Sequence, residues 1–476
     1  MVSFLTSIVI LILGYFIYGV FVEKVFGVDE NRKTPAIAME DGVDFVPLSW
    51  PKIFLIQFLN IAGLGPIFGA ILGALYGPAA FIWIVLGSIF AGGVHDYFSG
   101  MLSVRHEGKS VAEIVGIYLG ENARKIMRFF SVILLVLVGT VFMTGPAQLL
   151  ADLKFAGLSS LSVWIGIIIV YYFMATILPV DKIIAKIYPL FGAALLIMAV
   201  GIGSMLIIKG YDIPEVRFAS IHPENLSLWP MLFVTIACGA ISGFHATQSP
   251  MMARCLPNEK YGRRVFYGSM IAEGIIALIW AAAAMAFFNG GVVGLNNALT
   301  NSGGTAGVVN IISKSLLGKV GGILAMLGVI AAPITSGDTA FRSARLVIAD
   351  AIGYKQKETK NRLIVAVPLF IIGYLLTRID FTIIWRYFSW SNQTLAMIVL
   401  WATAAYLITN NKLHWIATVP ATFMTAVSIT YILQAPEGFK LPQTISYPVG
   451  IIAAIIAIVL FLHKFKLRNK PVADRI

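Results

Sequence analysis

Apolar runs of about 20 residues recur along the whole chain, and they constrain the fold more than any other feature. A helix of that length crosses the roughly 30 Å hydrocarbon core of a bilayer. The chain has 476 residues, of which 58% are hydrophobic and 12% are charged. Soluble domains are about 25% charged, so this chain lacks the polar residues needed to cover a water-facing surface. We therefore predict an all-α polytopic membrane protein and exclude a soluble enzyme, a nucleic-acid-binding protein or a disulfide scaffold.

The hydropathy pattern predicts about 13 transmembrane helices, joined mostly by short connections. The longer connections are residues 23–52, 105–125, 289–319 and 338–362. The predicted spans are residues 3–22, 53–76, 79–104, 126–150, 160–178, 187–208, 228–252, 265–288, 320–337, 363–378, 384–407, 412–433 and 447–464.

The distribution of lysine and arginine predicts the orientation. With the N-terminus outside and the C-terminus in the cytoplasm, 27 of the 35 basic residues fall on the cytoplasmic side and 8 on the other. Cytoplasmic loops of membrane proteins carry this excess. The same rule accounts for the net charge of +12 without a nucleic-acid partner.

Two spans are interrupted by glycines, and they lie five spans apart. The second predicted span contains Ala62-Gly63-Leu64-Gly65-Pro66, and the seventh contains Gly239-Ala240-Ile241-Ser242-Gly243. Because five is odd, the two spans enter the membrane from opposite sides. This predicts two five-helix repeats of inverted topology, residues 53–208 and 228–407. One extra helix precedes them within residues 1–52, and two follow within residues 412–476.

Broken helices in corresponding positions of two repeats indicate the binding site of a transporter. Unwound backbone offers carbonyl groups to cations, and the N-terminus of a half-helix offers amides to anions. For the ladder of Gly65, Gly69, Gly73 and Gly77 alone, the four-residue spacing favours close helix packing. We expect a substrate carboxylate at the amides after Pro66. The candidate substrate-binding residues are Ala62, Gly63, Leu64, Gly65, Pro66, Ile67, Ser242, Gly243, Phe244 and His245.

Ionisable side chains inside predicted spans are candidates for coupling to an ion gradient. His95 and Asp96 lie in the third span, and Glu273 lies in the eighth. Asp338, at the end of the ninth, is either a proton carrier or the partner of Arg342 or Arg345 in a salt bridge. Glu273 is either functional or a hydrogen-bonded structural carboxylic acid. The adjacent hydroxyls of Thr335 and Ser336 are oxygen ligands that suit Na⁺.

Aromatic side chains gather at the start of the eleventh predicted span. Together with Arg386 they are typical of an aromatic belt at the membrane interface: Trp385, Tyr387, Phe388 and Trp390. The polar residues just beyond either reach a cavity or make polar contacts between helices, and the second interpretation is favoured: Asn392, Gln393 and Thr394.

Five short motifs stand out along the chain: Thr34-Pro35-Ala36, Asp41-Gly42-Val43-Asp44-Phe45-Val46-Pro47, Ile61-Ala62-Gly63-Leu64-Gly65-Pro66, Gly93-Val94-His95-Asp96 and Cys238-Gly239-Ala240-Ile241-Ser242-Gly243-Phe244-His245. With these motifs the sequence resembles the carbon starvation protein A family. The resemblance implies a LeuT-like five-plus-five inverted repeat in a bacterial cytoplasmic membrane, with lipids as neighbours. It also implies import of short peptides during carbon starvation, or of pyruvate, coupled to H⁺ or Na⁺. It places substrate at the two broken helices and a candidate Na⁺ site at Thr335, Ser336 and Ala62.

The sequence thus favours a secondary active transporter that works by alternating access and has no catalytic residues or cofactor. No G-x-x-x-x-G-K-[ST] motif for ATP is present. One alternative is a membrane sensor that binds a nutrient without moving it. Another is an intramembrane hydrolase that uses Ser242 with His245 as its base, which requires the two side chains to be hydrogen-bonded. The sequence leaves the oligomeric state and the choice between peptide and pyruvate open.

Overall fold

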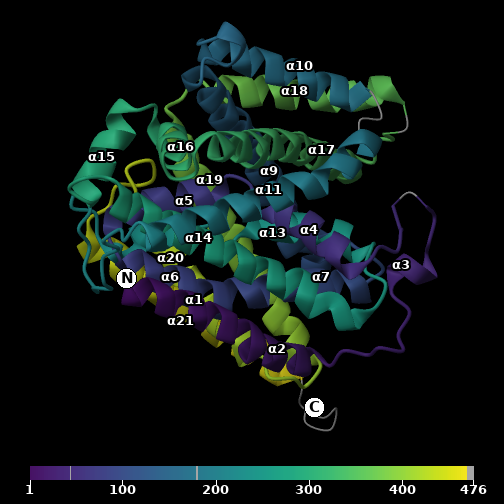
Figure 1. Ribbon diagram of the computed structural model, residues 1–476. Helices are drawn as coiled ribbons and strands as arrows, with labels where there is room; N and C mark the ends of the chain where they lie inside the picture. Colours follow the sequence, from purple (N-terminus) through teal and green to yellow (C-terminus); the bar gives the residue numbers. More distant parts are fainter. Residues whose placement is uncertain (43, 178–180, 357, 469–476) are drawn as a thin grey trace.

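The chain folds into a bundle of long helices that run roughly along one direction (Figure 1). The computed structural model describes residues 1–476 except 43, 178–180, 357 and 469–476; it gives no side-chain environment for residues 181–189 and 466–468. Helix α1 (Val2–Phe16) begins and helix α21 (Gln443–Arg468) ends at opposite ends of the bundle (Figure 1), as an odd number of crossings requires. Among the described residues, every regular element is a helix.

The helices are long because their sequences are apolar and contain few breakers. Within the part of the chain that the structure describes, ten are long and apolar enough to cross a membrane, and the bent pair α4 (Trp50–Ile61) and α5 (Gly65–Gly73) adds an eleventh span. The shorter apolar helix α10 (Leu161–Ile177) and the second interrupted segment complete the predicted set. The other spans are α1–α2 (Val2–Phe16, Tyr18–Phe26), α6–α7 (Ala79–Leu86, Gly93–Arg105), α9 (Glu121–Asp152), α11 (Asp181–Ile208), α14 (Gly268–Phe287), α16–α17 (Gly304–Ala325, Ala332–Ile352), α18 (Thr359–Leu376), α19 (Phe381–Thr409), α20 (Trp415–Gln434) and α21 (Gln443–Arg468).

Both predicted breaks are present, and they pack against each other. The axis bends by 48° between α4 and α5. The seventh span is helical at α12 (Phe233–Thr235), loses helical structure over residues 236–242 and resumes at α13 (Gly243–Ala253). A Cβ atom on Gly65 would lie 2.2 Å from the Cβ of Cys238, so only glycine allows this contact. Gly69 and Gly73 likewise lie against residues 235 and 236, which confirms the packing role predicted for these glycines.

The connections contain more helix than the sequence pattern predicts. Residues 289–319 include α15 (Val292–Asn301) and the first part of α16, which is interrupted at Gly318. The helix predicted to end at residue 337 continues as α17 to Ile352, because the next helix-ending signal is Gly353 in the left-handed conformation. Short helices α3 (Pro35–Ala38) and α8 (Val111–Leu119) occupy two other connections.

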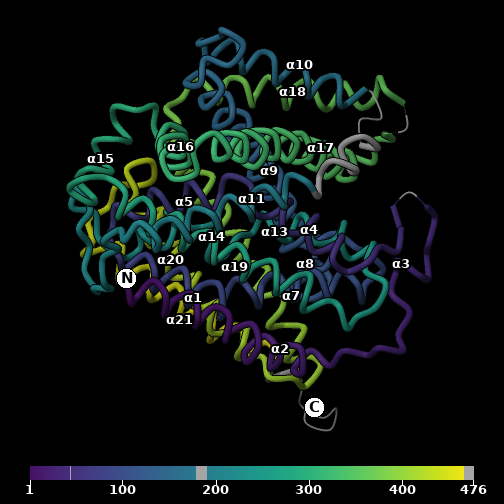
Figure 2. Tube along the Cα trace, in the orientation of Figure 1, coloured from purple at the N-terminus to yellow at the C-terminus, as the bar shows by residue number. Residues whose placement is uncertain are grey.

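The prediction of an interfacial aromatic belt at the start of α19 is wrong for two of its residues. Trp385 and Phe388 are 2% and 1% exposed. Helix α19 lies inside the bundle, in contact with α9, α13 and α20, so side chains near its start are covered by neighbouring helices. Helices α10 and α18, by contrast, lie side by side at one edge of the bundle (Figures 1 and 2).

Candidate functional site

Four buried ionisable side chains from three helices meet beside the second broken helix. His95 and Asp96 lie on α7, His245 opens α13, and Glu273 lies on α14. Each is 0% exposed. A π-helical turn, η2 (Gly87–Gly92), directly precedes α7, and such turns frequently occur at functional sites. The sequence had named all four residues, and the structure brings them together.

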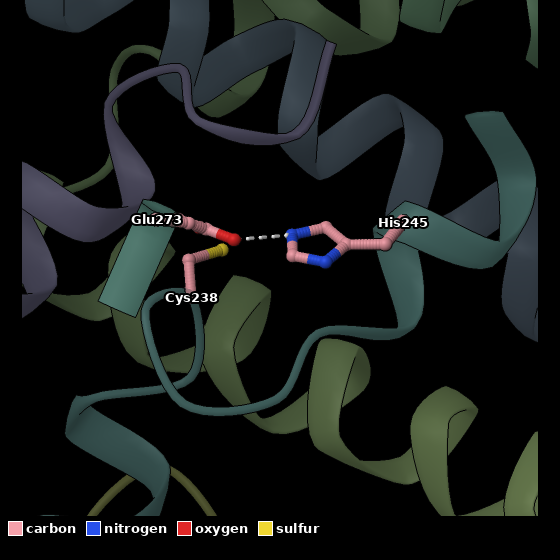
Figure 3. A group of neighbouring side chains, drawn as sticks. All are labelled: Cys238, His245 and Glu273. Carbon is pink, nitrogen blue, oxygen red and sulfur yellow. Dashed lines mark ion pairs between the residues drawn. The ribbon is translucent and has the colours of Figure 1, made fainter. Parts of the chain in front are cut away.

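His245 is the centre of this cluster because each of its ring nitrogens faces a carboxylate. Nδ1 lies 2.8 Å from Oδ2 of Asp96, and Nε2 lies 3.3 Å from Oε2 of Glu273. The imidazole points from α13 toward Glu273 (Figure 3). The other oxygen of Asp96 lies 2.7 Å from Nδ1 of His95. An imidazole between two carboxylates can hold a proton on either ring nitrogen and pass it to either neighbour.

The polar backbone of the second break is held by side chains from two other helices. Gly239 donates its N–H to Oε1 of Glu273 at 3.1 Å, and its carbonyl accepts the Ser88 hydroxyl at 3.0 Å. Unwound backbone is tolerated at membrane depth only where protein or water satisfies it. Glu273 therefore has two roles, since one oxygen holds the break and the other faces His245.

Asn392 of α19 caps α13 from outside that helix. Its Oδ1 accepts the Phe244 N–H at 2.7 Å and the Ser242 hydroxyl at 3.0 Å. Its Nδ2 donates to the Cys238 sulfur at 3.3 Å. From the sequence, Asn392 either reaches a cavity or makes contacts between helices, and because the second interpretation was favoured it was not a candidate site residue. A buried amide next to apolar residues was the available signal, but its partners are 148 and more positions away in the chain.

The first break is closed tightly in this conformation. The candidate residues from Ala62 to Ile67 are all buried. A Cβ atom on Gly63 would lie 2.7 Å from the Phe142 ring. The Ile67 amide, expected to face a carboxylate, donates to the Leu64 carbonyl at 3.2 Å. A substrate at this break therefore requires the neighbouring helices to move.

Thr335 and Ser336 lie on α17. The Thr335 hydroxyl donates to the Ala332 carbonyl at 2.7 Å. Ala332 packs against Leu59 of α4, three residues before Ala62. The hydroxyl pair thus lies on a helix that packs beside the first broken helix.

Asp338 forms the salt bridge that the sequence offered as one alternative. Its Oδ2 lies 3.1 Å from Nη2 of Arg342, one helical turn further on. Asp338 is 3% exposed and belongs to α17, inside the helix and not at its end.

Cys238, His245 and Glu273 are side chains of types that also bind transition metals, and their ligand atoms all lie within 4.8 Å of one another (Figure 3). A cysteine binds a metal as the thiolate. Here the Cys238 sulfur lies 3.5 Å from the Ser242 hydroxyl and 3.3 Å from Nδ2 of Asn392.

The serine and histidine of the hydrolase hypothesis do not form a catalytic pair in this structure. The Ser242 hydroxyl donates to Asn392, while both ring nitrogens of His245 face carboxylates. A serine nucleophile needs a base within hydrogen-bond distance, so this geometry does not support hydrolysis.

Two interrupted helices inside a bundle of apolar helices, with buried ionisable side chains at the second interruption, define a polytopic membrane transporter. Solved structures support the fold. A manganese transporter of Eremococcus coleocola aligns over 92% of this chain and 99% of its own, with a TM-score of 0.55 and 14% identity. Mhp1, in its inward-facing conformation, aligns over 93% and 96%, with a TM-score of 0.51 and 12% identity. The fold is the LeuT-like five-plus-five inverted repeat, with one extra helix before it and two after.

The chain belongs to the carbon starvation protein CstA family, whose model matches residues 1–165, 152–320 and 296–431. A membrane protein of Haemophilus influenzae is 45% identical over 60% of this chain and 91% of its own length. The peptide transporter CstA of Campylobacter jejuni is 24% identical over 93% and 81%. The pyruvate/proton symporter BtsT of Escherichia coli is 26% identical over 58% of this chain and 48% of its own length. The resemblance predicted from the motifs is thus confirmed.

Proposed function

We propose that the protein is a secondary active transporter that imports a small carboxylate-bearing nutrient, a short peptide or pyruvate, together with protons. The observation that carries this proposal is His245, fully buried between Asp96 and Glu273 and placed at the start of a half-helix. The names of two relatives, a peptide transporter and a pyruvate/proton symporter, point to the same substrates and ion.

The proton would act through the cluster of His95, Asp96, His245 and Glu273. Electrostatic interactions between charges are stronger in a buried site of low dielectric than in water. Adding or removing one proton there therefore changes the interaction energy between the helices that carry these residues. Glu273 also holds the Gly239 amide. Protonation of His245 or Glu273 would therefore change the hydrogen bond between Glu273 and the Gly239 N–H. This would couple proton binding to the opening of the second broken helix. Alternating access follows if the substrate occupies the opened breaks, at residues 62–67 and 242–245.

Sodium is the second candidate for the coupling ion. The candidate site is formed by Thr335, Ser336 and carbonyl oxygen near Ala62. It is supported by the packing of Ala332 on Leu59, which brings α17 to the first broken helix. Asp338 is the weakest candidate for coupling, because Arg342 already pairs with it.

The boundaries of the repeats, the membrane location and the orientation are also part of this proposal. We propose inverted repeats at residues 53–208 and 228–407, with extra segments at 1–52 and 412–476. We also propose a bacterial cytoplasmic membrane location, with the N-terminus outside and the C-terminus in the cytoplasm. The observed charge pattern along the sequence supports this orientation.

Uptake into proteoliposomes tests the function. Labelled pyruvate and labelled dialanine are each offered with an inward proton gradient or an inward sodium gradient. We expect accumulation of one substrate with the proton gradient. Accumulation driven only by sodium would move the coupling site to Thr335 and Ser336. Binding of a substrate without accumulation would refute transport and favour the nutrient sensor.

A further inference from the structure

A groove lies between the extra helix α1, the first half of the first broken helix and α14. It has a volume of about 680 Å³, and its lining comes from α1, α4, α14 and the π-helical turn η6 (Arg263–Tyr267) that precedes α14. Helices α1 and α4 both pack against α14, and the groove separates them from each other. We call this space the Arg264 groove. Six of its lining residues are used below: Phe16, Trp50, Arg264, Gly268, Ala272 and Ile275.

The body of the groove is apolar and open to the surroundings of the bundle. Its lining residues on α14 run from Gly268 to Ile275, about 10 Å along the helix axis. Phe16 of α1 lines it as well and is 62% exposed. All three helices belong to spans that are long and apolar enough to cross a membrane, so the groove opens toward lipid chains. A hydrocarbon chain from the bilayer is therefore the occupant that this surface fits.

One end of the groove carries a positive charge that no carboxylate neutralises. Arg264 is exposed, and its guanidinium carbon lies 5.1 Å from the centre of the Trp50 ring. The adjacent Arg263 pairs with Glu23 at 2.9 Å, whereas no carboxylate among the described residues pairs with Arg264. Contact with the ring orients the guanidinium without using its N–H groups. Those donors remain available to a phosphate, which arginine binds well.

The other charged groups around η6 leave this positive charge uncompensated. Carboxylates near the turn each have a basic partner: Glu23 with Arg263, Glu30 with Lys260 and Glu259 with Arg105. Lys52, near the start of α4, is exposed and adds a further positive charge. In the proposed orientation this end of the groove lies on the cytoplasmic side, where anionic lipids give the membrane surface a negative potential. The charge of the groove and that of the membrane surface are therefore complementary.

We propose that the Arg264 groove binds one phospholipid with an anionic headgroup. The acyl chain would lie along Gly268, Ala272 and Ile275, and the phosphate would pair with Arg264. Basic pockets between transmembrane helices on the cytoplasmic side bind anionic headgroups in this way. The lipid would contact α4, which leads into the first break, and α14, which carries Glu273, and would hold both against α1. Lipid binding does not require transport, so this inference is independent of the proposed function.

Native mass spectrometry of the full chain, purified in detergent and freed of bound lipid, tests the headgroup. Phosphatidylglycerol and phosphatidylcholine with the same acyl chains are titrated separately. We expect phosphatidylglycerol to bind about fivefold more tightly, which is the contribution of one arginine to binding an anionic lipid. Arg264→Gln should remove this preference. Arg128→Gln is the matched control, because Arg128 of α9 is partly exposed on the same proposed side of the membrane, has no ion pair among the described residues and does not line the groove.

A second variant tests the apolar part of the groove. Ala272 is half-buried and lines the groove. The ring of Ala272→Phe would take space from the acyl chain, and each methylene group that it displaces should weaken binding of both lipids about fourfold. Ala453→Phe is the matched control, because Ala453 is a half-buried alanine on α21 that does not line the groove.

The outcomes decide the site whether or not the protein transports. Equal affinity of the wild type for the two lipids, or a loss in Arg264→Gln no larger than in Arg128→Gln, would refute the anionic headgroup. Binding of both lipids by Ala272→Phe as by the wild type would refute the groove as the place of the acyl chain. Dimers of the wild type that disappear in Ala272→Phe would show a second copy of the chain in the groove and overturn the lipid. Should Arg264→Gln not fold, the comparison of the two lipids and Ala272→Phe decide.

Discussion

Replacing Asn392 with alanine is the sharpest test of how the second break is held. Asn392 supplies the only recorded acceptor for the Phe244 N–H, whereas Ser242 can turn its hydroxyl toward the Cys238 sulfur at 3.5 Å. The alanine variant therefore leaves one buried N–H without a partner, which costs about 1–3 kcal/mol. The lost amide volume adds a small cavity and a further cost of about 1 kcal/mol. We expect a total destabilisation of about 2–4 kcal/mol from these two effects.

The measurement is thermal unfolding of purified protein in detergent, followed by uptake in proteoliposomes. Asn392→Ala should lower Tm by several degrees and reduce uptake, because α13 carries His245 and begins at the lost cap. Thr403→Val is the matched control on the same helix. Thr403 is 0% exposed and its hydroxyl has no partner among the described residues, so its loss should leave Tm and uptake nearly unchanged. Wild-type Tm and uptake in Asn392→Ala would refute the capping role.

Three further predictions concern the site and the N-terminal contact with Glu215. His245→Ala should abolish proton-driven uptake while the protein still inserts; normal uptake by the folded variant would remove His245 from the mechanism. Gly63→Leu should abolish substrate binding, because even a Cβ there lies 2.7 Å from the Phe142 ring, and retained affinity in an equilibrium binding assay would count against the proposed first break. The N-terminal amine and Ser3 lower the pKa of the Glu215 carboxyl to about 2, so this contact stabilises the fold above the ordinary glutamate pKa of about 4.3 and is lost as pH falls through about 2. The Tm difference between wild type and Glu215→Gln, measured against pH, should be constant near neutrality and shrink below about pH 4; a difference that does not change with pH would contradict this contact.

The site was partly predictable because its signals are local. A histidine, an aspartate or a glutamate inside an apolar run stands out by itself, so His95, Asp96, His245 and Glu273 could each be named from the sequence. Asn392 and Cys238 could not be placed in the site in the same way. An amide or a thiol in an apolar helix is common enough that only its neighbours decide its role, and those neighbours lie on other helices.

The roles of the α17 residues show the same division. The sequence offered both a salt bridge and a proton carrier for Asp338, and the fold placed Arg342 within 3.1 Å of it. At the start of α19, in contrast, the prediction from the sequence was wrong for two residues. Its aromatic residues match the composition of a membrane interface, but the surrounding helices bury Trp385 and Phe388. Composition records which residues are present and cannot record which helix covers them.

The sequence by itself determined that the chain spans a membrane as helices, and where two of those helices break. These properties depend on the hydrophobicity of about 20 neighbouring residues and on glycine and proline within a few positions. Only the tertiary structure decided which groups meet at the breaks. His245 reaches Asp96 across 149 positions, and the glycines of the first break fit against Cys238 of the second. Contacts between residues so distant in the chain arise from how the helices pack, which no local pattern encodes.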